Sequence, residues 1–423
     1  MFEKLARVWK VKELRNSILF VLAMLAVFRL FAHIPIPGID ASNLRSFFSN
    51  NPLLGFVNIF SGGGMERFSV VMMGIGPYIT SSIIFQLLGM IVPKLEEMQK
   101  EEAGRQKINM WTRWVTVPLA IVQAFGMLAL LRQSNAIDLS GSTTFDIMAI
   151  VITITAGTIF LMWIGELISE KKIGNGISLL IFAGIVASLP QGISQMILTF
   201  DQTQLFIMIA FALLAIITIV GVVIVNEGQR NIPIQYARQI RGNRAYGGTN
   251  SHLPLRVNMA GVIPIIFALA VATFPTMIAQ YFQYAKTEWI ANFSQWIIMT
   301  FNNQWVYGIL YFVLVFAFTY FYTDVVFHPD RISENLQKQG GFIPGIRPGK
   351  QTAEYIGNTS HKIIFFGALF LAVIAVLPLV VQAATGVQSM VIGGTSILIV
   401  VSVVIDTIKQ LEAQLTMREY DGV

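Results

Sequence analysis

The feature that most constrains this chain is a series of long apolar stretches that recurs along its 423 residues. About 18 consecutive apolar residues are enough to cross ~30 Å of hydrocarbon as an α-helix. Barrel strands would alternate polar and apolar residues, and these stretches do not. We therefore expect an all-α polytopic membrane protein with ten transmembrane helices. The expected spans are 17–34, 69–92, 114–131, 146–167, 177–197, 205–225, 258–280, 304–323, 363–382 and 389–408.

Positive charge is distributed unevenly between the two sides of this bundle. The chain carries 29 Lys and Arg and a net charge of +6. With the N-terminus inside, the outer loops hold only Arg45, Arg67, Arg132 and Lys286, as expected when cytoplasmic loops retain the Lys and Arg. We therefore expect both termini in the cytoplasm. Direct sequence-specific binding to nucleic acid is not needed to explain the charge.

Matching motifs suggest an inverted repeat that divides the chain at about residue 204. Gly74-Ile75-Gly76-Pro77 in the second span corresponds to Gly261-Val262-Ile263-Pro264 in the seventh. The fifth and tenth spans open similarly, with Gly176-Ile177-Ser178 and Gly394-Thr395-Ser396-Ile397. Interrupted helices at matching places in inverted halves indicate the functional axis of a transport protein. The alternative is chance, because Gly and Pro are common in membrane helices.

Two expected cytoplasmic loops, 226–257 and 324–362, are much longer than the usual loop of about 4–6 residues. Both contain apolar or aromatic residues, such as Ile232, Tyr236 and Phe342, that could anchor an ordered platform. The alternative is that they only supply the positive charge that sets the orientation. The Pro- and Gly-rich turns around Phe342 favour a shaped platform, because they restrict the backbone.

Few residues are suited to catalysis. The chain has no Cys, and none of its four His lies in a His-Glu-x-x-His metal motif. The glycine-rich stretch 61–64 lacks the Lys-Ser or Lys-Thr ending of a phosphate-binding loop. The spans are nearly free of charge, and Arg29 and Glu166 lie near helix ends, where they can reach the interface. We expect no enzyme activity, no cofactor and no metal.

The interrupted helices are lined mainly by Ile, Gly, Ser and Thr. Such a constriction cannot coordinate ions, but it can close by dewetting and widen around an irregular solute. Gln86, Gln123 and Asn258 are neutral polar groups within the spans, where amides commonly bond to neighbouring helices. The outer segment 58–68 is too polar to face lipid. It is either a short re-entrant element with a glycine hinge or a simple surface loop.

Six segments resemble one family, in the same order along the chain. They are HIPIPGID at 33–40, NIFSGG at 58–63, GPYI at 76–79 with QLL at 86–88, IGNGIS at 173–178, HLPLRVNMAGVIP at 252–264 and FIPGIRPG at 342–349. On these segments the chain resembles the SecY family, the channel subunits of the bacterial protein-export translocon. The resemblance implies a bacterial cytoplasmic membrane protein with two inverted five-helix halves, 1–204 and 205–423, around a central pore.

The resemblance also implies the site residues. The waist of the pore would be an aliphatic ring of Ile75, Ile79, Ile177, Ile181, Ile266 and Ile399. The plug that closes the outer funnel would contain Phe60, Ser61, Gly62, Gly63, Gly64, Met65, Glu66 and Arg67. The lateral gate, between the second and third spans and the seventh and eighth, would carry Gln86, Gln123 and Asn258. The cytoplasmic loops would dock partners through Arg238, Arg244, Lys338 and Arg347.

The implied function is a protein-conducting channel that passes unfolded polypeptides across the membrane and transmembrane segments sideways into lipid. The implied partners are the small membrane subunits SecE and SecG, the SecA motor ATPase, the ribosome, and preproteins that carry signal peptides. A partner would supply the energy. The alternative is an inverted-repeat secondary transporter of a small solute, which the scarcity of intramembrane charge disfavours.

Overall fold

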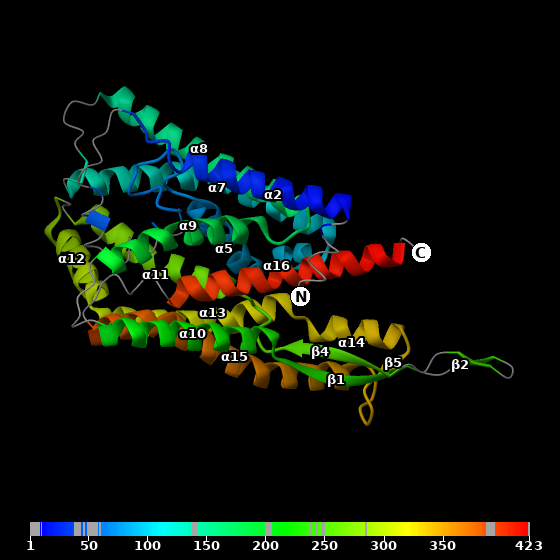
Figure 1. Cartoon of the computed structure of the whole chain (residues 1–423). Helices are drawn as coiled ribbons and strands as arrows, with labels where there is room; N and C mark the ends of the chain where they lie inside the picture. The colour runs from blue at the N-terminus through cyan, green and yellow to red at the C-terminus, as the bar shows by residue number, and fades with distance from the viewer. Residues whose placement is uncertain are drawn as a thin grey trace.

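The computed structural model is a bundle of long helices with a narrow β-ribbon projecting from one end, which we call the ribbon end (Figure 1). The structure describes residues 9, 11–37, 44, 47–48, 58, 61–134, 136–137, 143–198, 205–236, 239–241, 244–246, 250–283, 286–385 and 394–421. The long helices are α2 (Lys12–Phe31), α5 (Gly76–Ile91), α7 (Glu102–Gln133), α8 (Thr144–Glu170), α9 (Gly176–Leu198), α10 (Leu205–Glu227), α11 (Ile263–Phe282), α13 (Gln304–Val326), α15 (Lys350–Thr385) and α16 (Gly394–Asp421). The shorter helices are α6 (Pro93–Lys100), α12 (Glu288–Asn302) and α14 (Pro329–Lys338).

Each expected span overlaps one of the long helices, but the helices differ in their ability to cross a membrane. Within the described ranges, six are long and apolar enough to do so alone: Lys12–Phe31, Glu102–Arg132, Thr144–Glu170, Ile209–Glu227, Gln304–Lys338 and Lys350–Ala383. The pair α5 and α6, bent by 112°, raises this number to seven if it forms one span. The protein is therefore a mostly helical, multi-pass membrane protein, and the number of ten crossings stays a prediction.

The first part of the expected second span, 69–92, is not helical. Residues 61–75 run through successive turns, which we call the turn segment, and α5 begins only at Gly76. Phe68 and Gly74 have φ angles of 49° and 55°. An α-helix needs φ near −63°, so it cannot pass through these residues.

The two Gly-Pro motifs have the same backbone geometry. Gly74 and Gly261 have φ angles of 55° and 65°, and a helix begins two residues after each glycine. Pro77 and Pro264 occupy the second position of α5 and α11, where the missing N–H leaves no helical hydrogen bond unmade. The sequence predicted interrupted helices here. The motifs instead start helices. A helix cannot continue through the positive φ of Gly74 or Gly261, so the residues before each glycine are not helical.

The expected loop at 226–257 contains strands, so the all-α prediction is wrong in this part of the chain. A three-stranded antiparallel sheet has the order β4-β1-β5. Its strands are β1 (Gln229–Tyr236), β4 (Asn250–Arg256) and β5 (Gly341–Phe342). Farther from the bundle, β2 (Gln239–Arg241) and β3 (Arg244–Tyr246) form a second antiparallel pair (Figure 1).

One small apolar core joins the two long loops. The side chains of Ile232 and Ile234 in β1 are buried and alternate with exposed neighbours, which is the period-two pattern of a half-buried strand. They pack in one cluster with Leu336 of α14, Ile343 and Ile356. The described parts of both loops are therefore regular structure with a shared core.

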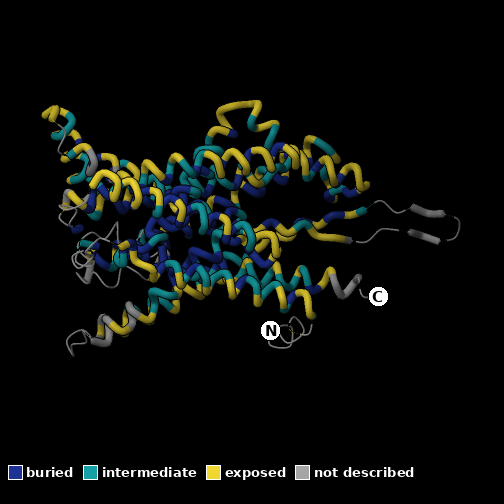
Figure 2. The backbone as a smooth tube through the Cα atoms, turned by 90° about the horizontal axis from the view of Figure 1, so that it is seen from above, coloured by how far each residue is buried: buried dark blue, intermediate teal, exposed yellow. Residues whose placement is uncertain are grey.

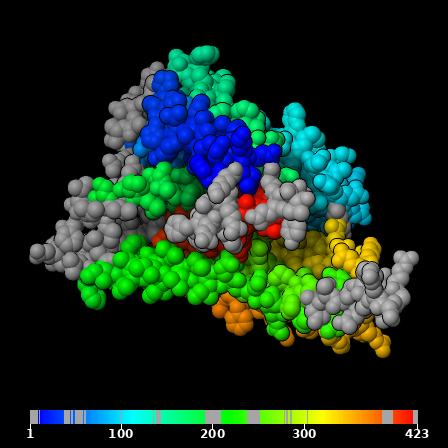
Figure 3. Space-filling model, turned by 45° about the vertical axis from the view of Figure 1, so that its right-hand side comes forward, coloured from blue at the N-terminus to red at the C-terminus, as the bar shows by residue number. Residues whose placement is uncertain are grey.

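Burial differs strongly between the helices (Figure 2). Only 17% of the most apolar part of α2 and 11% of that of α10 is buried inside the protein, compared with 50% for α8 and α15. Ile217 and Ile224 of α10 are 70% and 64% exposed. Such faces belong in lipid or against another membrane helix. From the ribbon end, the blue and cyan early helices lie along one side and the green to orange later helices along the other (Figure 3).

Gly157 of α8 packs against the backbone of the turn segment. A Cβ atom at this position would lie 2.1 Å from the carbonyl oxygen of Val70. We expect Gly157→Ala to reduce the stability of the detergent-solubilised protein by about 1–3 kcal/mol, because the backbone must shift to admit the methyl group. The measurement is size exclusion after heating. Gly126→Ala is the control, because nothing lies within 4 Å of its Cβ position. Equal melting of the two variants would contradict the close approach.

Candidate functional site: an aliphatic cluster and the turn segment

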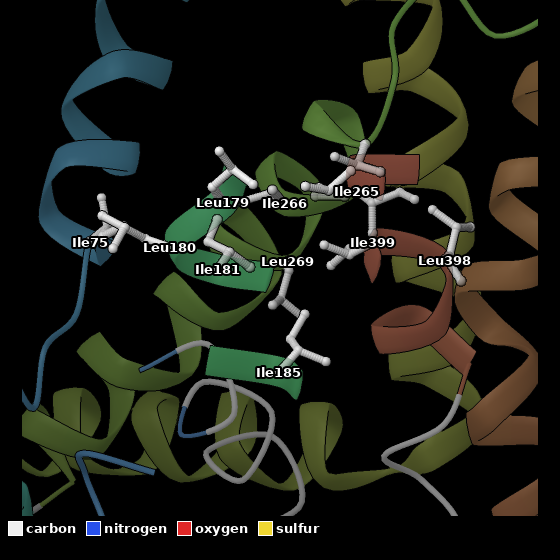
Figure 4. Packing of buried hydrophobic residues seen from close by; sticks show 14 of the residues in the cluster. Ile75, Leu179, Leu180, Ile181, Ile185, Ile265, Ile266, Leu269, Leu398 and Ile399 are labelled. Carbon is white, nitrogen blue, oxygen red and sulfur yellow. The ribbon is translucent and has the colours of Figure 1, made fainter. Parts of the chain in front are cut away.

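An aliphatic cluster forms where four helices from distant parts of the chain meet, namely α5, α9, α11 and α16 (Figure 4). Ile181 of α9 and Ile399 of α16 are 2% and 0% exposed. Every residue predicted for the waist either belongs to this cluster or packs against it: Ile75, Ile79, Ile177, Ile181, Ile266 and Ile399. The structure therefore brings these six residues together, although they are spread over 325 positions of the sequence.

A cavity of about 110 Å³ adjoins the cluster. Its lining includes four of the six isoleucines, namely Ile75, Ile79, Ile181 and Ile266. Besides Ile75, the turn segment contributes Ser61, Met65, Met73 and Gly74. Leu269 also lines the cavity and was not predicted, although its i, i+3 spacing from Ile266 places both on one face of α11. None of the lining residues is charged. A space with such a lining holds water poorly and opposes the entry of ions.

Two of the predicted waist residues do not line this cavity. Ile177 lies in the first turn of α9, and its Cγ1 is 3.4 Å from the position that a Cβ would take on Gly165 of α8. Ile399 lies beside Ile265 and Ile266 in the cluster (Figure 4). Their packing is clear, and their place in the waist stays a prediction.

The predicted plug lies in the turn segment, except for Phe60, which is outside the described residues. From Ser61 to Phe68 the backbone forms successive turns. Met65 and Phe68 are each 1% exposed and belong to a second apolar cluster that includes residues of α7 and α8. The segment therefore lies inside the protein, which excludes the simple surface loop that the sequence left open.

Arg29 anchors the turn segment to α2. Its Nη1 donates a hydrogen bond to the carbonyl oxygen of Gly62, a charge-assisted contact of the stronger kind. Gly62 has a φ of 69°, and a Cβ atom on it would come within 3.3 Å of Arg29, Phe28 and Gly184. From the sequence, Arg29 was expected to reach the membrane interface. The sequence does not show the contact with Gly62, because the partner is a backbone atom 33 residues away.

The remaining residues of the predicted plug, Gly63 to Arg67, are held by fewer hydrogen bonds from their side chains. Gly63 and Gly64 form a turn in which the Gly63 N–H donates to Asn58 O at 2.9 Å. The backbone N–H of Glu66 donates to Asn58 Oδ1 at 3.2 Å. The Nη1 of Arg67 is buried and has no hydrogen-bond partner among the described residues. An unsatisfied buried donor costs about 1–3 kcal/mol. The buried position of the segment is therefore less stable than its apolar contacts alone would make it.

Two of the three predicted gate amides lie on adjacent helices. Gln123 Nε2 of α7 donates to Thr80 Oγ1 of α5 at 3.5 Å. Gln86 Nε2 donates to Ser82 Oγ at 3.3 Å within α5. Both α5 and α7 contact α11, which belongs to the later half of the chain. The two glutamines thus lie on the pair of helices that faces the later part of the chain.

Asn258 is not brought together with these glutamines. It precedes α11, in the part of the expected span 258–280 that is not helical. Its Nδ2 donates to Asn226 Oδ1 at 2.7 Å, and Asn226 Nδ2 donates to Ser402 Oγ at 2.6 Å. These bonds anchor the start of α11 to α10 and α16. They give no support to the gate role predicted for Asn258.

The charged residues near the ends of the bundle form ion pairs. Glu166 of α8 pairs with Arg113 of α7, a partner that the sequence analysis missed. Glu227 Oε1 at the end of α10 lies 2.8 Å from Lys409 Nζ of α16. The described part of the chain contains no group of three or more His, Cys, Asp or Glu placed to hold a metal ion.

The four predicted docking residues are placed unevenly. Arg238 lies outside the described residues, and Arg244 lies in β3 without a described side chain. Arg347 is exposed in the turn between β5 and α15, where its carbonyl oxygen accepts a 2.9 Å hydrogen bond from Thr352 Oγ1. Lys338 is exposed on α14 and forms an ion pair with a glutamate one turn earlier. Arg347 and Lys338 thus lie on one exposed platform at the ribbon end.

Comparison with known sequences identifies the family. The sequence model of the SecY family matches residues 69–408. A Bacillus subtilis chain named protein translocase subunit SecY is 45% identical over 437 residues, which cover 100% of this chain and 99% of that one. A chain of the same name from Thermotoga maritima is 42% identical and covers 100% and 97%. The chain belongs to the SecY family.

Solved structures share the fold at low sequence identity. The structure described as that of a protein conducting channel superposes with a TM-score of 0.61 at 18% identity, covering 93% of this chain and 91% of that one. Sec61 in the canine ribosome–channel complex gives a TM-score of 0.57 at 18% identity and the same coverage. Family membership rests on the sequence matches, and these structures show that the fold is shared.

The contact between Arg29 and Gly62 predicts how firmly the turn segment is held. Since the chain has no Cys, a single Met65→Cys provides a buried label site. Adding Arg29→Gln should raise the rate of modification by a water-soluble maleimide about tenfold or more, because hydrogen bonds to charged groups contribute about 1.5–3 kcal/mol. Arg132→Gln is the control, as Arg132 is exposed near the end of α7. Equal rates in both variants would show that Arg29 does not hold the segment.

Proposed function

We propose that this SecY-family chain is a protein-conducting channel that passes unfolded polypeptides across the membrane and releases transmembrane segments sideways into lipid. The observation that carries the proposal is the cavity between the turn segment and the aliphatic cluster. Its volume of about 110 Å³ is too small for a polypeptide. The structure is therefore a closed form, and passage requires the helices to separate and the turn segment to leave.

The aliphatic lining suits a substrate of no fixed sequence. Contacts between apolar side chains are non-directional, so the same isoleucines can surround many different polypeptide segments. Ions and water gain no polar partner in such a waist, which keeps it closed to them when it is narrow. The lining has no charged group to pair with a coupling ion, and its polar side chains are few, so it does not favour the alternative of a small-solute transporter.

The arrangement of the cavities supports a sideways exit. A groove of about 760 Å³ lies between α7, α8 and α11, and apolar side chains line most of it. Gln123 of α7 and Phe274 of α11 line both this groove and the small cavity. Separation of α7 from α11 would join the two spaces. We assign the lateral gate to this seam, with α5 and α7 on one side and α11 and α13 on the other.

The proposed topology has ten crossings in two inverted halves, 1–204 and 205–423, with the ribbon end and both termini in the cytoplasm of a bacterium. The distribution of Lys and Arg supports this orientation. The platform formed by the ribbon, α14 and Arg347 would dock a SecA motor or a ribosome, which supplies the energy. The exposed faces of α2 and α10 suit small membrane subunits such as SecE and SecG, or lipid.

Replacing the isoleucines of the cavity tests the function directly. We expect Ile75→Ser, Ile181→Ser and Ile266→Ser, combined, to make the resting channel leak ions in planar bilayers, because polar side chains let water enter the waist. The control combines Ile216→Ser and Ile217→Ser on α10, which are 58% and 70% exposed. A conductance no higher than that of this control would count against the waist.

Arg347 tests the docking platform. We expect Arg347→Glu to impair motor-driven export of a preprotein into reconstituted vesicles, because the charge reversal repels an acidic partner surface. The control is Lys350→Glu, the same reversal at an exposed position three residues away. Thermal melting should be unchanged in both variants. Normal export by Arg347→Glu would remove Arg347 from the docking surface.

A further inference from the structure

Helix α12 is a part of the structure that the sequence analysis did not predict. It lies at the end of the bundle opposite the ribbon and runs across the direction of the long helices (Figure 1). It connects α11 to α13 and contacts both of them. Near its end, Phe301 packs against the main apolar cluster. α12 is therefore an ordered helix that is held on the bundle.

The side chains of α12 fall on three separate faces. The first faces the protein and contains Ser294, which is 4% exposed, and the half-buried Ile290 and Ile297. The second is aromatic and exposed: Trp289, Phe293 and Trp296 are 71%, 56% and 61% accessible. The third is exposed and mostly polar: it contains Glu288, Asn292 and Gln295, with the 72% exposed Met299 toward its end.

The helical period explains this separation. Residues 289, 293 and 296 are spaced four and three apart, so they share one face of the helix. The rings of Phe293 and Trp296 stack, with centroids 6.0 Å apart and planes inclined by 20°. A rigid aromatic patch of this kind, exposed next to a polar strip, is unfavourable in water and typical of a partner surface.

The surroundings of the patch indicate that its partner is lipid. Phe282 at the end of α11 and Trp305 at the start of α13 are 44% and 67% exposed. They continue the apolar surfaces of α13, which is long and apolar enough to cross a membrane, and of α11, a shorter apolar helix. Trp is enriched where the hydrocarbon meets the headgroups, because its ring is apolar and its N–H is polar. A helix with one aromatic face and one polar face lies in the plane of that interface.

We propose that the aromatic face of α12, formed by Trp289, Phe293 and Trp296, is a lipid-binding surface inserted at the membrane–water interface opposite the ribbon end. The helix contains no Lys or Arg and one acid, Glu288. The surface therefore recognises the boundary between the acyl chains and the headgroups and does not require anionic lipid. The polar face points to water, and the first face, with the buried Ser294, stays on the bundle.

This surface couples the lipid interface to two long helices. Only Asn303 separates α12 from α13, and its side-chain oxygen accepts a 3.1 Å hydrogen bond from the N–H of Trp305. A movement of α11 and α13 away from α7 must therefore carry α12 with it or bend its junctions. Insertion of the aromatic face resists this movement. The link to gating rests on the proposed function, whereas the lipid contact does not.

Spin labelling tests the lipid contact on the full-length chain in phosphatidylcholine vesicles. Since the chain has no Cys, Phe293→Cys, Trp296→Cys and Gln295→Cys each give one label site. The accessibility of each label to oxygen, which dissolves in lipid, is compared with its accessibility to a water-soluble nickel chelate. We expect labels at 293 and 296 to favour oxygen, at a depth of roughly 5–10 Å. The label at 295 should favour nickel.

Two results would overturn the proposal. Equal preference for nickel at all three positions would place the aromatic face in water, and low accessibility of 293 and 296 to both reagents would show that protein covers it.

Quenching of native Trp fluorescence by brominated lipid gives a measurement without labels. We expect Trp289→Phe with Trp296→Phe to lower the absolute fluorescence intensity that brominated lipid quenches, and an unchanged quenched intensity would contradict insertion. Neither measurement needs translocation, so failure here is distinct from failure of the channel.

Discussion

The packing of aliphatic side chains between helices from opposite ends of the chain is the interaction on which the rest of the structure depends. The cluster joins residues of α5 and α9 to residues of α11 and α16. Contacts of this kind contribute through buried area and have no directional requirement. They can therefore fill the space between the helices closely and can still part without leaving buried polar groups unpaired.

The directional interactions are placed elsewhere. The chain of hydrogen bonds from Asn258 through Asn226 to Ser402 keeps the start of α11 with α10 and α16. The Ser81 hydroxyl donates to Thr112 O at 2.8 Å and ties α5 to α7. These bonds make each group of helices rigid. A soft seam between rigid groups is the arrangement that a channel needs if it is to open sideways.

Close backbone approach supports the same arrangement. The turn segment can lie inside the bundle because Gly157 of α8 admits the Val70 backbone and Gly62 fits between α2 and α9. One charge-assisted bond from Arg29 holds it there, while Arg67 retains an unsatisfied buried donor. The turn segment is therefore held by a few identifiable contacts that oppose a local cost. The free energy that holds the turn segment in place depends on the Arg29 hydrogen bond and on the cost of the unsatisfied Arg67 donor.

The sequence by itself determined the membrane class, the places of the long helices and the family, because long apolar stretches and contiguous motifs are local properties. It also indicated that Gly74 and Gly261 mark equivalent points, since only glycine adopts their positive φ without strain. Period-two alternation around Ile232 was visible in principle, but it is short and lay in a loop dominated by charge. Only the tertiary structure decided that α5 starts late, that Arg29 holds Gly62 and that Asn258 bonds within its own set of helices. It also decided that the aromatic face of α12, whose spacing is local, stays exposed when the helices pack. Each of these depends on atoms that are distant in the sequence and meet only when the helices pack, and no local pattern records such meetings.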